Sequence, residues 1–562
     1  MKEKGRVAEL ENLTKAEDLN GTIGIAHTRW ATHGKPNKVN SHPHLDNSKT
    51  ISVVHNGIIE NCADIKKFLM DNGYRFLSET DTEVIPNLIH YYYETEHDFL
   101  KAVSLACQDL MGSYAIEILC ADVPGTMIVA KKDSPLVIGV APDGNYIASD
   151  IPAVLDYTKD FYLLEDNEIV ELTQSDIHFY TTVLSPVEKS LVTITWDASA
   201  IEKNGYEDFM LKEIHEQPVS VRETIGFKLN SSSIDLDGIS FTKEYLESLQ
   251  KIVIVACGTA MHAGLAVKGI FENLCHIPVE VDMASEFRYR NPLINERTLA
   301  IFISQSGETA DTIQALKLAK AKGATTLAIS NVIGSSITRE ADKYMYTHAG
   351  PEIAVASTKA YTSQVVLLDI LALYCAQVLG ALSDADLAYY KKELHGLPDK
   401  IEEVLKNAEA MKIIAKDLYT ARDAFFLGRG VDYPVAMEGS LKLKEISYIH
   451  SEAYPSGELK HGSIALIEDG FPVIGIITDE KLVEKSISNI QEVISRGAKT
   501  VIVTNQEMTK NFDYVIKIPR VTPFLSPILS VIPLQLLAYY ISKEKGLDVD
   551  KPRNLAKSVT VE

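Results

Sequence analysis

The spacing of apolar positions predicts that the second half of the chain alternates between β-strands and α-helices. Residues 299–303 form an apolar run of the length of one buried strand, and apolar side chains then recur at helical spacing at Ile313, Leu316 and Ala319. The segment between them, 304–309, reads SQSGET and contains three hydroxyl groups. A helix N-terminus exposes unbonded N–H groups and the positive end of the helix dipole. The segment therefore suits a phosphate site, or only a helix cap.

This series of strand, small-residue turn and helix occurs twice. The predicted strands lie at 251–256, 279–281, 299–303 and 326–329, and again at 424–427, 472–478 and 500–503. The segments AKGATTLAISN (321–331) and SRGAKTVIVTN (495–505) show the repeat directly. We therefore expect two tandem parallel α/β units, each with ligand loops at the carboxyl ends of its strands.

Residues 1 to about 190 are predicted to form short strands and turns with two or three helices. A strand at 51–55 is followed by Asn56-Gly57, a strong signal for a tight turn. Further helices and strands follow in an order that fits two sheet layers with helices. The segment 191–245 contains too many apolar and aromatic residues to be a free linker, so we expect it to pack along a domain surface.

Composition narrows the functional classes. The chain has 562 residues, enough for several domains, and 55 basic against 77 acidic residues give a net charge of −22. This charge argues against nucleic acid as a partner. Two long apolar runs, 364–382 and 524–541, contain polar residues or prolines and are expected to be buried helices rather than membrane spans. The N-terminus has no signal-peptide pattern and the six cysteines form no C-x-x-C pair, which predicts a cytoplasmic protein without a disulfide framework.

Several motifs resemble those of one family over essentially the whole chain: the glutamine–fructose-6-phosphate aminotransferases (isomerising), also called glucosamine-6-phosphate synthases. The motifs are HTRWATHG (27–34), HPH (42–44), HNGIIEN (55–61), SETDTE (78–83), ACGTA (256–260), SQSGETADT (304–312), ASTKAYTSQ (356–364), EGSLKLKEISYIHSEAY (438–454), GELKHG (457–462) and DKPRNLAKSVTVE (550–562). The resemblance implies an α/β multidomain fold. An αββα amidotransferase domain of the N-terminal-nucleophile type, here truncated, precedes two doubly wound parallel sugar isomerase (SIS) domains.

The resemblance also implies domain boundaries and an activity. It places the amidotransferase domain at 1–190, a connector at 191–245, the two SIS domains at 246–385 and 386–548, and a catalytic tail at 549–562. The implied reaction makes glucosamine 6-phosphate and glutamate from fructose 6-phosphate and glutamine, for the synthesis of UDP-N-acetylglucosamine. Family membership further implies a homodimer or higher oligomer, no cofactor, no metal, and neither nucleic acid nor a membrane as partner.

In the amidotransferase half, the resemblance implies a glutamine pocket. Its residues are Arg29, Thr32, His33, His42, Asn56, Gly57 and Asp81. Arg29 and Asp81 are expected to hold the carboxylate and the amino group of glutamine, and Asn56 with Gly57 to form an oxyanion hole. Trp30 is expected to gate a channel that carries ammonia to the second half.

The chain departs from the family at its start. The family nucleophile is a cysteine at the mature N-terminus, whereas this sequence begins MKEKGRVAEL and its first cysteine is Cys62. Because a thiolate performs this step, we expect no glutamine hydrolysis if Met1 is the true start. If the sequence comes from a truncated reading frame, we expect the complete protein to be an ordinary family member.

In the second half, the resemblance implies a sugar-phosphate site and four catalytic residues. The residues expected to bind the sugar phosphate are Thr259, Ser304, Gln305, Ser306, Thr309, Ser357 and Glu438. Lys557 is expected to form a Schiff base, with its amine made neutral by burial or a nearby cation. Glu445 would move a proton between C1 and C2 with help from Lys442, and His461 would open the sugar ring from the neighbouring subunit. The family usually has serine where this chain has Ala260, which removes one possible hydroxyl contact.

Simpler interpretations remain open for these residues. Lys442 and Glu445 have the spacing of a solvated ion pair on a helix, and a lysine near a C-terminus such as Lys557 is usually mobile. Cys257 suits a small buried cysteine better than a nucleophile, and the histidines at 27–44 match no common zinc pattern. Two other functions also compete with the leading one. They are an ammonia-dependent sugar-phosphate isomerase or deglycase, and a sugar-phosphate sensor without turnover.

Overall fold

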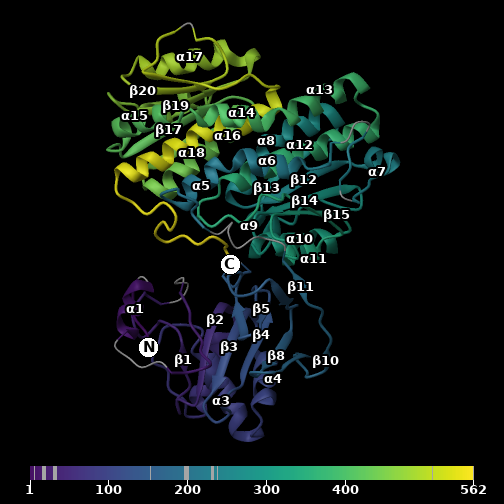
Figure 1. The fold of residues 1–562 in the computed structure, drawn as a ribbon, viewed down its shortest axis with the longest axis vertical. Coiled ribbons are helices and arrows are strands. Elements are labelled where there is room, and N and C mark those ends of the chain that lie inside the picture. Colours follow the sequence, from purple (N-terminus) through teal and green to yellow (C-terminus); the bar gives the residue numbers. More distant parts are fainter. Residues whose placement is uncertain are drawn as a thin grey trace. The chain divides into compact units, whose positions relative to one another are not determined.

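The computed structural model describes residues 1–5, 7–15, 20–29, 34–151, 153–194, 202–229, 233–236, 238–508 and 510–560. The chain divides into two compact units, one of residues 1–198 with 559–562 and one of residues 199–558. Figure 1 labels many of their elements.

The N-terminal unit contains a seven-stranded and a four-stranded antiparallel sheet. The first has the order β1 (His44–Leu45), β2 (Ile51–Ile59), β3 (Gly112–Cys120), β4 (Met127–Lys132), β8 (Glu168–Leu172), β9 (Ile177–Thr181) and β10 (Pro186–Val187). The second has the order β11 (Val192–Thr193), β7 (Asp160–Leu163), β5 (Val137–Ala141) and β6 (Gly144–Ala148). The helices are α1 (Val7–Thr14), α2 (Cys62–Asp71), α3 (Val84–Glu96) and α4 (Phe99–Asp109). This arrangement confirms the two predicted sheet layers with helices.

Strand alternation explains the layering of this unit. In β4, Ile128 and Ala130 belong to the core that the larger sheet shares with α2, α3 and α4, whereas Met127 and Val129 belong to the core beside the smaller sheet. Successive side chains of a strand point to opposite faces, so one strand contributes to both cores.

The predicted turn at Asn56-Gly57 is wrong, because β2 continues through both residues to Ile59. Gly57 pairs with Tyr114 of β3 and has a φ of +134°. A Cβ at Gly57 would overlap the backbone oxygen of Ser113. The glycine therefore permits a close approach of two strands rather than a chain reversal.

The second unit contains two five-stranded parallel sheets with equivalent strand orders. The first is β13 (Val279–Met283), β12 (Lys251–Ala256), β14 (Thr298–Ser304), β15 (Thr325–Ser330) and β16 (Lys343–Tyr346). The second is β18 (His450–Pro455), β17 (Asp423–Gly428), β19 (Pro472–Ile477), β20 (Lys499–Thr504) and β21 (Tyr514–Lys517). The predicted tandem repeat and the fold class are confirmed, although β16, β18 and β21 were not predicted.

Helices cover the parallel sheets (Figure 1). In the first repeat they are α8 (Gly258–Cys275), α9 (Ala284–Tyr289), α10 (Ala310–Ala321), α11 (Ser336–Glu340) and α12 (Lys359–Leu379). Then follow α13 (Asp384–His395), α14 (Leu397–Leu405), α15 (Ala408–Leu418), α16 (Asp432–Ser447), α17 (Val483–Ile494) and α18 (Ser526–Glu544). One hydrophobic core joins the two repeats, and α8 packs against α16 across it.

The two long apolar runs are α12 and the helical segment 523–544 that contains α18. Both are long and apolar enough to cross a membrane, but 78% and 89% of their most apolar windows are buried inside the protein. Burial of this extent is typical of core helices.

The connector packs more deeply than expected. It forms α5 (Phe209–His215), α6 (Gln217–Ile225) and α7 (Lys243–Ser248). Met210, Ile214 and Val221 are fully buried in the core that joins the two parallel α/β repeats. The connector is thus a structural part of this unit.

Candidate functional site

The loop between β14 and α10 carries the predicted phosphate-binding hydroxyls. Ser304 ends the strand and Thr309 is the N-cap of the helix, and their side-chain oxygens lie 2.9 Å apart. The Ser304 hydroxyl also accepts the backbone N–H of Gly307 at 3.0 Å, and the Ser306 hydroxyl accepts that of Glu308 at 3.1 Å. The loop therefore gathers hydroxyls at the positive end of a twelve-residue helix, as an anion site requires.

Gly307 is required for this loop. Its φ of +72° lies in the left-handed region, and a Cβ there would overlap the side chain of Ser335. The loop between β14 and α10 can therefore keep its shape only with glycine at this position.

A buried ionic cluster forms where α8 packs against α16. Lys442 lies 2.7 Å from Glu445 and 3.5 Å from Glu438, measured between nitrogen and carboxylate oxygen, and its side chain is only 1% exposed. The Lys442 amine also donates to the Thr259 hydroxyl at 3.1 Å, and that hydroxyl donates to Glu438 at 3.1 Å. His262 of α8 adds a contact of 2.8 Å to Glu438. The lysine is therefore not part of a solvated surface pair.

Charge fixes the protonation state of Lys442. Burial alone would lower the pKa of this amine, but the carboxylates of Glu445, Glu438 and Glu352 raise it well above its usual value. Lys442 is therefore a permanent cation that orients Glu445, which keeps 21% of its side chain exposed.

Lys557 is held in place rather than mobile. Its amine donates to Glu352 at 2.5 Å, to the backbone oxygen of Ala354 at 2.9 Å, and to the Ser357 hydroxyl at 3.4 Å. The next residue, Ser558, lies 2.9 Å from the Ser306 hydroxyl. The C-terminal tail thus connects the lysine with residues 304–309, the loop between β14 and α10 that we call the hydroxyl loop.

The neighbour of Lys557 differs from the expected one. A cation or an apolar surrounding was expected, whereas the structure places the buried carboxylate of Glu352 beside the amine. Burial would raise the pKa of Glu352, but its ion pair with Lys557 and the backbone N–H groups of Thr358 and Ala360 hold this pKa below its usual value. Glu352 therefore stays ionised and paired with the Lys557 amine, so substrate must displace or neutralise this pair before the amine can attack.

His461 stands apart from these groups. It ends a short 3-10 helix, Leu459–His461, and is exposed to solvent. Among the described residues, no hydrogen bond or ion pair joins its ring to Glu438, Lys442, Glu445 or Lys557.

Several of the predicted glutamine-pocket residues in the described part of the N-terminal unit lie among a buried group of histidines. His27 lies 2.8 Å from the side-chain oxygen of Asn56 and stacks on His42 with ring centroids 4.1 Å apart. His42 accepts the backbone N–H of His55 at 3.2 Å. Burial lowers the pKa of His42, that of His44 to about 3 and that of His55 to about 4, so these rings are neutral at pH 7.

Arg29 and Asp81 lie near each other in this region. Burial lowers the pKa of Arg29 while the charge of Asp81 raises it, and Asp81 accepts the backbone N–H of Ile59 at 2.8 Å. The structure therefore brings His42, Asn56 and Asp81 to the neighbourhood of Arg29. Trp30, Thr32 and His33 lie outside the described residues.

None of the six cysteines is an activated thiol. Burial raises the pKa of Cys62, with a further contribution from Asp81, and burial raises the pKa of Cys107 and Cys275 to about 12. Burial also raises the thiol pKa of the remaining three, Cys120, Cys257 and Cys375. Cys257 is partly rather than fully buried, and its raised thiol pKa gives no sign of a nucleophile.

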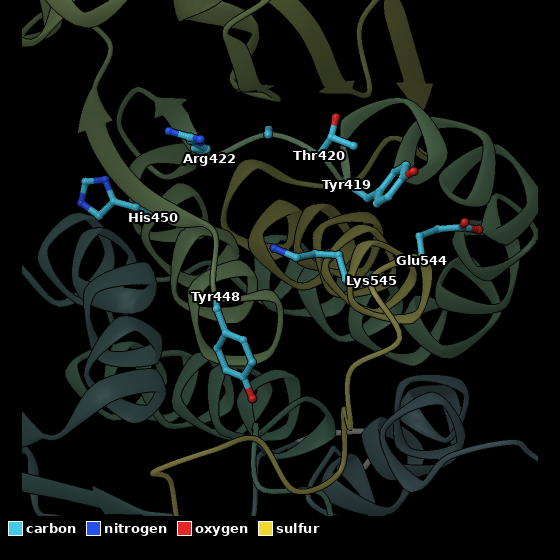
Figure 2. Close-up of a pocket in the computed structure, with 8 residues that line it drawn as sticks. Tyr419, Thr420, Arg422, Tyr448, His450, Glu544 and Lys545 are labelled. Carbon is cyan, nitrogen blue, oxygen red and sulfur yellow. The ribbon is translucent and has the colours of Figure 1, made fainter.

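An open cleft of about 730 Å³ lies elsewhere in the second unit (Figure 2). Arg422, Tyr448, His450 and Lys545 are among its lining residues, and none of the predicted site residues lines it. It borders the tail, because the Arg553 guanidinium stacks on Tyr448 at 4.0 Å.

Sequence reasoning missed two residues of the site. Glu352 and His262 lie outside the quoted motifs, and only the packing of distant segments places them beside Lys557 and Glu438. Glu352 lies five positions before Ser357 and belongs to no periodic pattern of residues, so the sequence alone does not mark it as part of the site.

Known proteins resemble this chain over all of its length. The SIS domain family model matches residues 245–374 and 417–542, and the glutamine amidotransferase domain model matches residues 27–156. The glutamine–fructose-6-phosphate aminotransferases of Clostridium perfringens and Caldanaerobacter subterraneus are each 54% identical to this chain over all of its length and 93% of theirs. The solved C-terminal domain of the Francisella tularensis enzyme superposes with a TM-score of 0.60, at 42% identity over 62% of this chain and all of that one. The chain therefore belongs to the family of isomerising glutamine–fructose-6-phosphate aminotransferases.

Proposed function

We propose that the chain converts fructose 6-phosphate to glucosamine 6-phosphate, with the sugar chemistry in its two SIS repeats. One observation supports this most strongly: Ser558, which follows the tail lysine Lys557, contacts Ser306 of the hydroxyl loop, with the two side-chain oxygens 2.9 Å apart. Glu352, the ion-pair partner of Lys557, also acts electrostatically on the amine of Lys442. This interaction links Lys557 to the charged residues of α16.

The phosphate binds at the N-terminus of α10. The hydroxyls of Ser304, Ser306 and Thr309 and the amide of Gln305 hold it, with Thr259 and Ser357 nearby. Glu438 is buried and already accepts hydrogen bonds from Thr259 and His262. It therefore orients these two side chains and has little capacity left to bind the sugar hydroxyls.

Lys557 attacks the C2 carbonyl of the open-chain sugar. The amine nitrogen bonds to C2, the carbonyl oxygen leaves as water, and an imine remains. Once substrate displaces the ion pair with Glu352, the ammonium can release its proton to solvent and the free amine can attack.

Glu445 then moves a proton between C1 and C2. Lys442 orients the Glu445 carboxylate at 2.7 Å, and the partial exposure of Glu445 leaves one side open to the substrate. Ammonia displaces the lysine from C2, and the proton transfer converts the ketose skeleton into the amino aldose.

Ammonia comes from glutamine bound in the N-terminal unit. Arg29 and Asp81 hold its carboxylate and amino group, Asn56 and Gly57 face the developing oxyanion, and His42, Thr32 and His33 complete the pocket, with Trp30 at the channel. A second candidate is a synthase that uses ammonium directly. The raised thiol pKa of every cysteine in the chain favours it for this polypeptide, because glutamine hydrolysis needs a thiolate.

The exposure of His461 supports a homodimer in which the histidine opens the sugar ring in the partner's site. We also propose a cytoplasmic location and the domain boundaries 1–190, 191–245, 246–385, 386–548 and 549–562. Only the two small-molecule substrates are required as ligands.

Product formation separates the candidates. The chain is incubated with fructose 6-phosphate and either glutamine or ammonium, and glucosamine 6-phosphate is measured by mass spectrometry. Product with either nitrogen source supports the full synthase, and product with ammonium alone supports the second candidate. No product under either condition contradicts both and leaves a sugar-phosphate sensor.

A further inference from the structure

Glu213 of α5 is a buried carboxyl group that the mechanism above does not use. It is 1% exposed, and its Oε1 accepts the backbone N–H groups of Ile353 at 2.5 Å and Ala354 at 3.1 Å. These residues directly follow Glu352, and the carbonyl of Ala354 accepts from the Lys557 amine. Glu213 therefore fixes the short segment that holds the lysine.

The same helix also contacts the chain that leads to Lys557. Asp550 accepts the backbone N–H groups of Phe209 and Met210, at 2.9 and 2.8 Å, at the start of α5. The backbone oxygen of Asp550 in turn accepts the N–H of Val355 at 3.0 Å. Thus α5 contacts both the tail that carries the lysine and the segment that receives its amine.

The second oxygen of Glu213 indicates its protonation state. Oε2 is buried and has no hydrogen-bond partner among the described residues. Burial and the charge of Glu352 raise the pKa of Glu213 to about 8, against the opposing charges of Lys557 and Lys359. The carboxyl group is therefore neutral at pH 7, and an amide can replace it without changing the local charge.

We propose that Glu213 is a positioning residue for Lys557, which holds the backbone at Ile353 and Ala354 so that the lysine amine faces the sugar carbonyl. This inference rests on the proposed Schiff-base chemistry. It gives the connector a part in the isomerase reaction, since the carboxyl group acts through the segment 352–354 and never touches the substrate.

The test compares three variants of the full chain: Glu213→Ala, Glu213→Gln and the control Glu223→Gln, which makes the same change at an exposed site on α6. Fructose 6-phosphate and cyanoborohydride are added without a nitrogen source. Hydride reduces the imine carbon to a stable secondary amine, and mass spectrometry measures how fast the adduct forms on Lys557. Thermal melting checks that each variant is folded.

Glu213→Ala should slow adduct formation about 10- to 100-fold, because a small displacement of the reacting amine has an effect of this size. Its half-saturating sugar concentration should stay within about threefold, because the hydroxyl loop is unchanged. Glu213→Gln should restore the rate to within about threefold of the wild type, because its amide oxygen can accept both N–H groups. Glu223→Gln should behave as the wild type.

A pH series adds a second readout that does not depend on the alanine variant folding. Above pH 8 the wild-type carboxyl group ionises beside Glu352 and disturbs the segment, whereas the glutamine variant cannot. The ratio of the Glu213→Gln rate to the wild-type rate should therefore rise between pH 7 and 9.

Three results would overturn the inference: wild-type rates in folded Glu213→Ala, equal loss in the glutamine and alanine variants, or a ratio that stays constant with pH. Absence of an adduct in the wild type would overturn the proposed Schiff base itself and the inference with it. An adduct on wild-type Lys557 that is insensitive to Glu213 would overturn the inference alone.

Discussion

Replacing Lys442 with methionine removes the cation that lies between Glu438 and Glu445. Methionine keeps the length of the side chain, so the change isolates the charge and its hydrogen bond to Thr259. Glu438 is fully buried, and the variant leaves its carboxylate without the ion pair that compensates its burial. We therefore expect a loss of both stability and isomerase activity.

The structure places the stability loss at the lower end of the usual range. Removing one partner of a buried ion pair costs about 3–5 kcal/mol. Glu438 keeps its contacts to Thr259 and His262, and Glu445 is partly exposed and can turn towards water. We therefore expect a loss of about 3 kcal/mol; because residues 199–558 share one core and are more than 250 residues, the melting temperature should fall by less than the roughly 6–12 °C expected for a unit of 150–250 residues.

The pKa of Lys442 predicts how this loss depends on pH. Because the folded-state pKa is raised above the ordinary 10.5, the stabilisation is fully present below that value and is lost only as the pH rises through the folded pKa. The difference in melting temperature between variant and wild type should therefore be equal at pH 6 and pH 8.

Differential scanning calorimetry of the full chain measures the melting temperature, and ammonium-dependent product formation measures activity. Lys444→Met is the matched control, since Lys444 is exposed on the same helix and its change should stay within about 0.5 kcal/mol. The double variant Glu438→Gln with Lys442→Met should recover part of the loss, because no uncompensated charge remains at Glu438. A Lys442→Met variant that melts as the wild type does would refute the reasoning that this cluster depends on its cation.

Four further results can be measured directly. Gly307→Ala should weaken fructose 6-phosphate binding and cost about 1–3 kcal/mol of stability through its left-handed backbone and the clash with Ser335; unchanged binding in a titration would contradict this. Lys557→Arg should abolish the reducible adduct while sugar binding persists, and an adduct mapped to another lysine would exclude the proposed Schiff base. A mixture of His461→Ala and Glu445→Gln subunits should regain product formation that neither shows alone, and failure of mixed dimers to do so would argue against a shared site. The melting temperature of the N-terminal unit should fall as the pH drops from 6.5 towards 4, because the folded pKa of His44 and His55 is lowered and the unfolded state binds more protons; a flat profile would show that these rings are already accessible to water.

Local pattern was enough to predict the repeats and the hydroxyl loop. Central strands such as β12 and β14 are continuous apolar runs because both of their faces are covered by helices. The loop at Ser304 follows from a strand, a glycine and a helix start that are adjacent in the sequence. In each case the signal lies within about twenty residues, so no distant contact is needed to recognise it.

The short edge strands depended on tertiary structure. The sequences of β16 (KYMY), β18 (HSEAYP) and β21 (YVIK) have no long apolar run, since an edge strand is covered less completely. Each becomes a strand because a neighbour already in the sheet supplies its hydrogen-bond partners. The same limit explains the wrong turn at Gly57, whose glycine is needed for the approach of Ser113 from another strand.

For the chemistry of the site, too, the sequence and the tertiary structure each determined a different part. The sequence by itself determined which side chains are available, because motifs fix the identity and spacing of Lys442, Glu445 and Lys557. Only the tertiary structure decided that Lys442 is a buried cation and that Glu352 and Glu213 converge on Lys557 from segments more than a hundred residues apart. Charge and burial act through space, and a residue's spatial neighbours are set by how helices and sheets pack rather than by the order of the chain.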